Sequence, residues 1–523
     1  MAEGAIKFVQ CLQGYCCEES KEKLCIGTHS CAANREGRIC GKYIKHHYVN
    51  FFDNKCSPNK NCVHRHWFWV VFAFMVIVLF ILVAFYRDIG CILKRCCCCS
   101  CCDENSSQNP QNPEDEQLIN AENDNDDDPS IFSILFGFIK ILFNFYQMKV
   151  LIAIAAPSSE NNNSIDFLKE ILPSIFTLKL TLKNDWNTFC PMENLDVIMK
   201  LFIRDVLPTL FLIGAALVLI IYCSLYRRVK QRFYPEDQDR PNDDLTFAVR
   251  YKVFLARITI IGYTGITTFL LLLTSYVTIY DNNKPVHVLL INGELKWGED
   301  PWSLAGCVLL PAWGFLFIPT LYFLSLRLQA GKITVDWFLF YLLVPPFYWM
   351  SLIARKCRGK PYTGDEVEEP KIKHLLSVFE DQFRKSKATK KVLLWDWWIL
   401  CRRFIVAFIC VYVKDYVVCY VLVIPVLAIF CVHHANVAPY KAKVLNHVEV
   451  VSFFSLLAIS TINMVWAFFY VYQLPFVDPV STVVEALKIT EAVITFIPFM
   501  VFLGYCLYLL CCRDSRCCRK RDR

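Results

Sequence analysis

The feature that most constrains this chain is a series of apolar segments, each about 20 residues long, separated by segments that hold the charges. A helix of that length crosses roughly 30 Å of hydrocarbon. Apolar residues make up 55% of the 523 residues, which is more than soluble cores bury. We therefore predict an all-α polytopic membrane protein, and this composition excludes a soluble enzyme.

Nine segments are predicted to span the membrane: 67–86, 131–155, 206–226, 254–280, 304–326, 394–413, 416–432, 448–472 and 488–510. The second contains Lys140 and Lys149, so an interfacial position stays open for it. Lys414 and Asp415 separate the sixth span from the seventh. A single tilted helix over 404–432 is the alternative, and it would reverse the orientation of every later span.

A further apolar block, 333–353, is interrupted by Pro345 and Pro346, which break helices. Thirteen Lys or Arg lie on both sides of it, between Arg327 and Lys391. We expect a re-entrant or interfacial segment, because that placement keeps all thirteen on the cytosolic side, where such residues are enriched. A full span stays the alternative.

The charge asymmetry predicts an N-terminus outside and a C-terminus in the cytosol of a membrane that we expect to be the plasma membrane. In this orientation the basic segment 227–232 and the basic tail are cytosolic. Apart from segment 156–205, the outside loops then contain only Lys284, Lys296 and Lys414 as cations.

The chain divides into five parts by composition. These are a cysteine-rich extracellular module (1–66), the first transmembrane helix (67–86), a cytosolic cysteine cluster with an acidic linker (87–130), a multi-helix membrane domain (131–511) and a basic cysteine-rich tail (512–523). Segment 103–128 holds ten Asp or Glu and no Lys or Arg, so we predict that it is disordered.

Eight cysteines precede the first apolar segment: Cys11, Cys16, Cys17, Cys25, Cys31, Cys40, Cys56 and Cys62. An even number in a short polar segment predicts a small, disulfide-rich ectodomain, whose connectivity stays open. A zinc module is the alternative, but it would favour paired C-x₂-C ligands, which this segment lacks. No signal peptide is recognisable, so either the first helix exports a short N-terminus or the chain is a fragment of a longer protein. The abrupt start favours the fragment.

Other cysteines lie beside membrane helices among Arg or Lys, a pattern typical of S-palmitoylation. They are Cys96, Cys97, Cys98, Cys99, Cys101, Cys102, Cys511, Cys512, Cys517 and Cys518, with metal binding by these thiols as the alternative. Asn162 in the sequence NNNS is a candidate glycosylation site, and Cys190 is the lone cysteine of its polar segment.

Three stretches carry a resemblance to a family: CAANREGRICG (31–41), LLWDWWILCRRFIVAFI (393–409) and APYKAKVLNHVEVVSFFSLLAISTIN (438–463). Together they resemble large multi-pass cell-surface proteins of invertebrates that have a cysteine-rich juxtamembrane ectodomain. The last stretch is also weakly similar to the membrane region of fungal flavin-carrier and transient-receptor-potential-like proteins. The family pattern continues as CG-x-C, whereas this chain has Tyr43 at the second cysteine.

Charged residues inside predicted spans are candidate functional groups, because they are costly in lipid. Arg402 and Arg403 lie two turns after Asp396, and we favour snorkelling to the inner leaflet over a gate or coupling element. Lys488 and Glu491 share one helix face and are predicted to pair, with an ion path as the alternative for Glu491. We also expect Glu449 to be a cytosolic interface contact.

The preferred functional hypothesis is a channel-like membrane domain. The alternatives are a receptor or adhesion protein that does not conduct, and then a transporter, for which only the block with Pro345 and Pro346 is an indication. Motifs of common enzymes are missing, so we expect no enzymatic activity, no cofactor and no metal site. The expected partners are membrane lipids but no nucleic acid, while a homo-oligomer and an extracellular ligand stay open.

Overall fold

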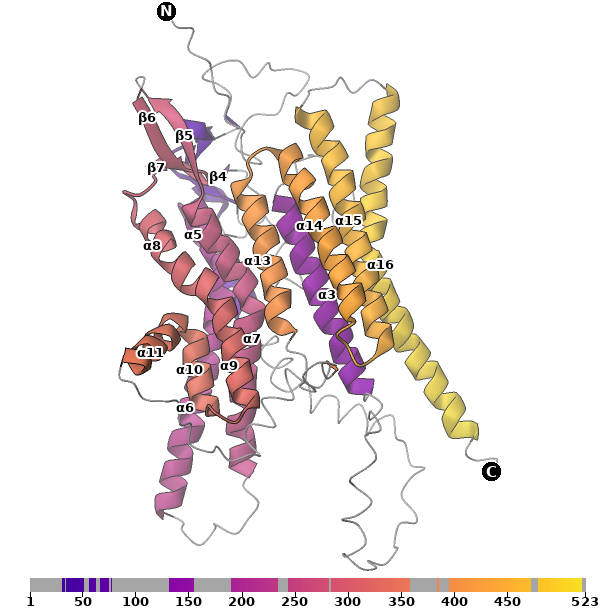
Figure 1. The fold of residues 1–523 in the computed structure, drawn as a ribbon. Helices are drawn as coiled ribbons and strands as arrows, with labels where there is room; N and C mark the ends of the chain where they lie inside the picture. The colour runs from indigo at the N-terminus through magenta and orange to yellow at the C-terminus, as the bar shows by residue number, and fades with distance from the viewer. Residues whose placement is uncertain are drawn as a thin grey trace, which may run out of the picture.

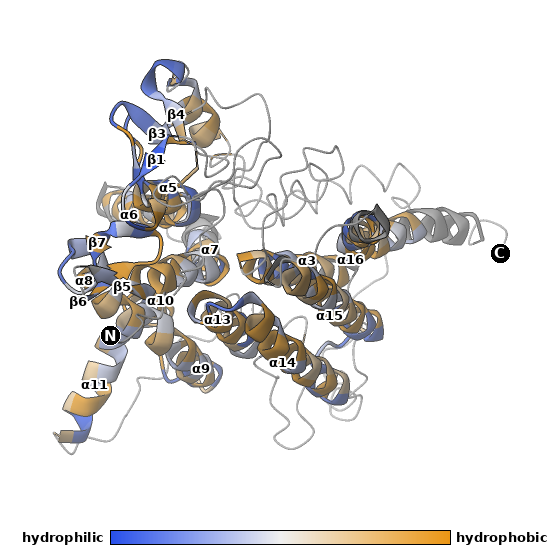
Figure 2. Cartoon of the chain, turned by 90° about the horizontal axis from the view of Figure 1, so that it is seen from above, coloured by the Kyte–Doolittle hydropathy of each residue, from blue (hydrophilic) through white to orange (hydrophobic). Residues whose placement is uncertain are grey.

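The computed structural model describes residues 31–32, 34–50, 56–62, 66–74, 77, 131–154, 190–233, 243–281, 284–357, 383–384, 395–471 and 478–519. Long helices, most of them roughly parallel, make up most of these residues, and short strands gather at one end of the helices (Figure 1). The helices are predominantly hydrophobic, whereas the strands at the N-terminal end are largely hydrophilic (Figure 2). Helices suit a membrane because all their backbone hydrogen bonds are internal.

Within the described residues, seven helical segments are long and apolar enough to cross a membrane, or eight if one bent pair counts as a span. The seven are α3 (Ile131–Ile154); α5 (Val197–Leu201) with η5 (Phe202–Val206) and α6 (Leu207–Phe233); α7 (Asp243–Thr274); α8 (Pro301–Leu309) with η7 (Leu310–Phe315) and α9 (Leu316–Gln329); α14 (Tyr416–Val437); α15 (Lys443–Val471); and α16 (Asp478–Arg519).

A mostly helical architecture with several helices that could span a membrane is thus confirmed, while the predicted number of nine spans is not. The sixth predicted span is α13 (Asp396–Tyr412), which has only 17 residues but packs against α3, α7 and α14. The first predicted span, 67–86, is described only at 66–74 and 77, where it is helical.

The block with two prolines forms two helices instead of one. α10 (Val335–Leu343) and α11 (Pro345–Cys357) meet at an angle of 114°. The bend follows from Pro345 and Pro346, because proline removes a backbone donor and clashes with the preceding turn. In Figure 1, α11 points away from the other helices. The prediction of an interrupted segment is confirmed in this respect.

The fourth predicted span ends earlier than expected, since α7 ends at Thr274. The next residues form β5 (Tyr276–Asp281), which pairs antiparallel with β6 (Lys284–Leu289), and β6 pairs antiparallel with β7 (Asn292–Lys296). The prediction of a helix to Tyr280 was wrong, because Val277 and Ile279 flank Thr278 in the alternation typical of a strand. The Trp297 indole donates to the Thr274 carbonyl over 3.1 Å and fixes the sheet to the end of α7.

α13 and α14 are separate helices, so the alternative of one tilted helix over 404–432 does not hold. Val413 has an extended backbone and ends α13. The Asp415 carboxylate accepts a hydrogen bond of 3.0 Å from the Val418 backbone N–H and caps α14. An Asp at this position satisfies an N–H group that has no partner within the helix.

The N-terminal module consists of β1 (Arg35–Glu36) paired with β2 (Lys42–Tyr43) and β3 (His47–Val49) paired with β4 (Cys56–Pro58), with short helices η2 (Arg38–Cys40) and η3 (Asn59–Asn61). It lies beside the β5–β7 sheet at one end of the bundle (Figure 1). We call the described part of the module, residues 190–196 and this sheet together the cap.

Candidate functional site

The three charged residues of α13 are all buried, with exposed fractions of 8% for Asp396, 1% for Arg402 and 5% for Arg403. The expected snorkelling to the inner leaflet was therefore wrong. Each side chain faces a neighbouring helix, because α13 lies in the middle of the bundle between α3, α7 and α14.

Arg402 forms an ion pair with Glu449 of α15. Its Nη1 donates to Glu449 Oε1 over 3.0 Å, and both side chains are 1% exposed. The guanidinium also lies over two aromatic rings, 5.3 Å from the centroid of Trp395 and 5.1 Å from that of Phe453. Such contacts help to hold a desolvated cation. The expectation that Glu449 is an interface contact was wrong, because this carboxylate is enclosed by α13, α14 and α15.

His434 of α14 is the third member of this cluster. Its side chain is fully buried, and Nδ1 lies 3.7 Å from the same Glu449 Oε1 that binds Arg402. Asn446 holds the adjacent turn, because its amide side chain bonds both the N–H and the carbonyl of Tyr440, over 3.0 and 2.9 Å. Among the described residues, Arg402 Nε and Nη2 have no hydrogen-bond partner. The cluster is therefore only partly satisfied.

Arg403, the next residue, lies in a neutral polar environment. Its Nε donates to Asn144 Oδ1 of α3 over 3.0 Å, and its Nη1 to Thr264 Oγ1 of α7 over 3.4 Å. Thr264 in turn donates to Gln147 Oε1 of α3 over 3.2 Å. Two consecutive arginines thus bind different sides of the bundle, since adjacent side chains on a helix point about 100° apart.

Asp396 does not pair with either arginine; it forms an ion pair with Lys140 of α3. The Lys140 ammonium also lies 4.7 Å from the centroid of the Phe383 ring. We call these side chains, Lys140, Asn144, Gln147, Thr264, Asp396, Arg402, Arg403, His434 and Glu449, the charge network. It joins α3, α7, α13, α14 and α15 through polar contacts in their interior.

The sequence contains one indication of the α3 side chains that contact the charged residues of α13, although the prediction did not use it. Lys140, Asn144 and Gln147 recur at helical spacing, so they form one polar stripe along a mostly apolar helix. A polar stripe in a membrane helix indicates a buried polar partner. Which partner it is depends on how the helices pack, and sequence spacing does not contain that information.

On α16, the Lys488 ammonium lies 4.8 Å from the centroid of the Trp466 ring of α15. Lys488 and Glu491 are both half-buried. Their pairing with each other, and an ion path along Glu491, stay predictions. The contact with Trp466 places this part of α16 against α15.

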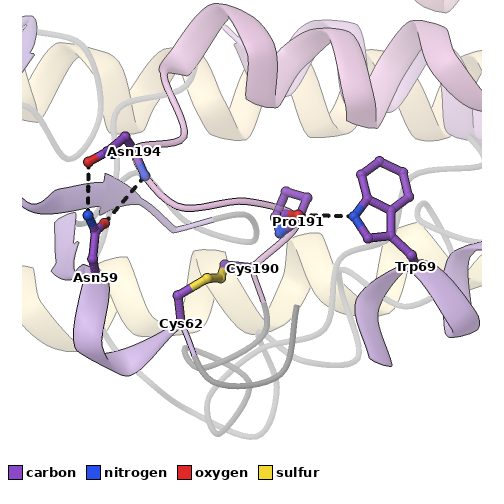
Figure 3. Close-up of a disulfide and its surroundings, with 6 residues drawn as sticks. All are labelled: Asn59, Cys62, Trp69, Cys190, Pro191 and Asn194. Carbon is purple, nitrogen blue, oxygen red and sulfur yellow. Dashed lines mark hydrogen bonds between the residues drawn. A yellow bond between two sulfur atoms is a disulfide. The ribbon is translucent and has the colours of Figure 1, made fainter. Parts of the chain in front are cut away.

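The cap contains two disulfides, Cys31–Cys40 and Cys62–Cys190. A disulfide-stapled module is confirmed for Cys31, Cys40 and Cys62, but the cysteines do not pair only among themselves. Cys190, which precedes α5, is the partner of Cys62 at a sequence separation of 128 (Figure 3). The bond joins the module to the membrane domain. Cys56 is buried in the described region and lies near Tyr43.

Hydrogen bonds continue this connection on either side of the disulfide (Figure 3). The Asn59 amide donates to Asn194 Oδ1 over 2.8 Å, and the Asn194 N–H donates to Asn59 Oδ1 over 3.3 Å. The Trp69 indole donates to the Pro191 carbonyl over 3.0 Å. The module is thus fixed to the loop that leads into α5.

Close contacts between backbone atoms also join the module to β7. Gly293 of β7 lies against the Arg38 carbonyl, and Gly41 of the module lies against the Gly293 backbone nitrogen, so closely that a Cβ at either glycine would overlap these atoms. The Arg38 N–H donates to Glu294 Oε1 over 2.8 Å. Only glycine allows such an approach of two backbones.

Several candidate residues lie outside the described residues. They are Cys11, Cys16, Cys17, Cys25, Cys96, Cys97, Cys98, Cys99, Cys101, Cys102 and Asn162. The four C-terminal cysteines, Cys511, Cys512, Cys517 and Cys518, belong to the last part of α16. Their lipidation stays a prediction.

Comparisons with known proteins give no match: no family model fits the chain, and neither the curated proteins nor the solved structures contain a significantly similar one. The functional argument therefore rests on the charge network and the cap.

Proposed function

We propose that this multi-pass membrane protein has a channel-like membrane domain, in which the Arg402–Glu449 pair couples movements of α13 and α15. The observation behind the proposal is the burial of this pair, at 1% exposure for both side chains, among apolar helices. His434 shares the Glu449 carboxylate. Partners from α13 and α14 therefore meet at one carboxylate of α15.

A passive membrane anchor has little need for such a cluster. Desolvation of two ions costs several kcal/mol each, and well-packed apolar residues are often about as stable or more stable in the same place. Intramembrane ionisable residues accordingly indicate function more often than structure alone. Because Arg402 Nε and Nη2 have no hydrogen-bond partner among the described residues, the guanidinium has donors left for a second arrangement.

The position of basic residues supports an orientation with the cap outside. The described helix α6 ends in the basic segment 227–233, and α15 begins at Lys443, two residues after Lys441. These ends of α6 and α15 lie at the end of the bundle opposite the cap (Figure 1). Cytosolic ends carry such residues. An N-terminal epitope should bind antibody on intact cells expressing the chain, and a C-terminal epitope only after permeabilisation. Exposure of both epitopes on the same side would contradict this orientation.

Recording from the purified chain in planar bilayers tests the channel hypothesis. We expect conduction under voltage, pressure or reduction of the cap disulfides. A variant with Arg402→Met and Glu449→Gln should fold but change the open probability, because it removes both charges of the coupling pair together. Lys296→Gln, on the surface of the cap, is the matched control. A folded sample that never conducts would contradict a channel.

Glu491→Gln tests whether α16 lines a cation path. If it does, the change should alter selectivity or conductance at normal surface expression, because it removes a local attraction for cations. If Glu491 only pairs with Lys488, the variant should instead fold less well, and Lys488→Met should restore folding, because an unpaired ammonium is the costly species in lipid.

A receptor that does not conduct is the second candidate. It is supported by the cap, which has an open cavity where the module meets the membrane domain. In a receptor the helices would transmit a signal without a pore. Ligand binding without conduction would favour this function over the channel. The resemblance to the invertebrate cell-surface family is compatible with either function, and membership of that family is likewise a proposal.

A further inference from the structure

A cavity of about 530 Å³ lies where the module, the loop before α5 and strand β7 meet. Its walls include Tyr43, Lys45, His46, Asn194, Asp196 and Glu294. Pockets for small molecules typically measure roughly 300–1,000 Å³. The cavity is open to the outside of the cap, and its lining includes charged and polar side chains beside a larger area of apolar surface.

The two walls of the cavity carry opposite charge. Lys42, Lys45 and His46 come from the module, whereas Asp196 and Glu294 come from the membrane domain. Lys42 forms an ion pair with Glu36 over 3.4 Å. Lys45 forms no ion pair within the part of the chain that the structure describes. The Asp196 carboxylate accepts a hydrogen bond from the Asn292 side chain and lies near Arg35, so the cavity is lined by a cation of the module and a carboxylate of the membrane domain.

The cavity is also held rigidly before any ligand binds. The Tyr43 phenol donates to the Asn194 carbonyl over 3.0 Å, and Asn292 donates to the Asp196 carboxylate over 3.4 Å. The disulfide Cys62–Cys190 lies beside this loop (Figure 3). A site whose walls are fixed in advance loses less entropy on binding.

We propose that this cavity binds a small zwitterion of the amino-acid class, with its ammonium group at Asp196 and its carboxylate at Lys45 and His46. Such a ligand carries one charge complementary to each wall, whereas a simple anion or cation would match one wall only. Asn194 and Tyr43 provide further polar groups between the two charged walls.

The inference deepens the proposed function and rests on it for its biological meaning, because Asp196 directly precedes α5 and a ligand would link the module to a membrane helix. Binding itself is independent of conduction. Binding without conduction would overturn the channel but not this inference. Conduction without binding would overturn this inference but not the channel.

The experiment uses the full chain in lipid nanodiscs and isothermal calorimetry. The probes are glycine, glutamate, lysine and phenylalanine, each with its methyl ester and its N-acetyl derivative. We expect at least one amino acid to bind, and both of its derivatives to bind at least about tenfold more weakly, since each lacks one charge. Equal binding of either derivative, or no binding of any probe at millimolar concentration, would overturn the proposal.

Variants locate the site. Lys45→Gln and Asp196→Asn should each weaken binding about tenfold or more. Lys284→Gln and Glu299→Gln are the matched controls, because they change exposed charges of the cap outside the cavity. Lys45 is exposed in a turn, so its variant is expected to fold even if Asp196→Asn does not. Unchanged affinity in the Lys45→Gln variant would contradict the assigned site.

The pH dependence provides a second readout. Burial raises the pKa of the Asp196 carboxyl, hydrogen bonds from the Val197 and Ile198 N–H groups oppose this shift, and the nearby charges of Arg35 and Asp300 have smaller and opposite effects. Protonation of Asp196 removes the attraction for an ammonium group, so binding should weaken as the pH falls through this raised pKa. Asp196→Asn should abolish this dependence. The measurement is repeated in a His46→Gln background, in which the imidazole is removed from the cavity wall.

Discussion

The cap and the charge network both join segments that are far apart in the sequence, but they use different contacts. The cap joins the module to the membrane domain through the Cys62–Cys190 disulfide and the backbone approach at Gly293. The network joins five helices through buried side chains such as Arg402 and Glu449. In water, ion pairs are weak, so covalent or backbone contacts are needed to hold distant segments of the cap together. Inside the bundle, helices have used their backbone groups, so side chains must select the partners.

The largest effect is expected in the network. Glu449→Gln should lower the free energy of unfolding by about 3–5 kcal/mol, because it leaves the Arg402 guanidinium buried without a counter-charge. Denaturation in mixed micelles, followed by loss of helical signal, measures the change.

The double variant Arg402→Met/Glu449→Gln separates charge from shape. It should recover most of the lost stability, because no unpaired ion is left. If the double variant is as unstable as Glu449→Gln, the cost comes from packing and the comparison between network and cap fails.

The charge network shows which residues of the site can be predicted from the sequence alone. The sequence identified Asp396, Arg402 and Arg403 as unusual, because charges in apolar helices are visible without a structure. It did not identify Glu449 as a partner, since a carboxylate near a helix end is equally compatible with an exposed contact. Burial of that position follows only from the packing of α13, α14 and α15.

The second effect concerns the cap. Cys62→Ser should cost about 2–5 kcal/mol, as expected for the loss of a native disulfide. Cys190→Ser should have the same effect, and the double variant should be no worse than either single one, because all three remove one bond. Unfolding followed in detergent without reductant measures these values. Clearly different single variants would contradict the pairing.

In the cap, composition predicted the type of link but not its partners. Eight N-terminal cysteines favoured pairing within the module. Cys190 is the lone cysteine of its polar segment, and nothing in the spacing relates it to Cys62 across 128 residues. The β5–β7 sheet was missed for a similar reason: its first strand continues an apolar helix, and only the change of period after Thr274 marks the boundary.

A smaller effect is expected at the backbone contact of the cap. Gly293→Ala should cost about 1–3 kcal/mol, because the added methyl group would overlap the Arg38 carbonyl and the Ile39 side chain. Gly214→Ala in α6 is the control, since no atom lies within 4 Å of its Cβ position. It should be neutral or slightly stabilising. Equal effects of the two variants would mean that the module does not press against β7.

The smallest effect is expected for an exposed ion pair of the cap, which can be compared with the buried ion pair of the network. The Lys296 ammonium lies 3.2 Å from Glu299 Oε2, but the two side chains are 52% and 71% exposed. Lys296→Gln should therefore change the free energy of unfolding by about 0–1 kcal/mol. Raising the salt concentration should reduce even this difference, whereas it should leave the effect of Glu449→Gln unchanged, because buried pairs are much less screened. If both variants respond to salt alike, water reaches the Arg402–Glu449 pair, and the network is then not the dry, side-chain-based counterpart of the cap.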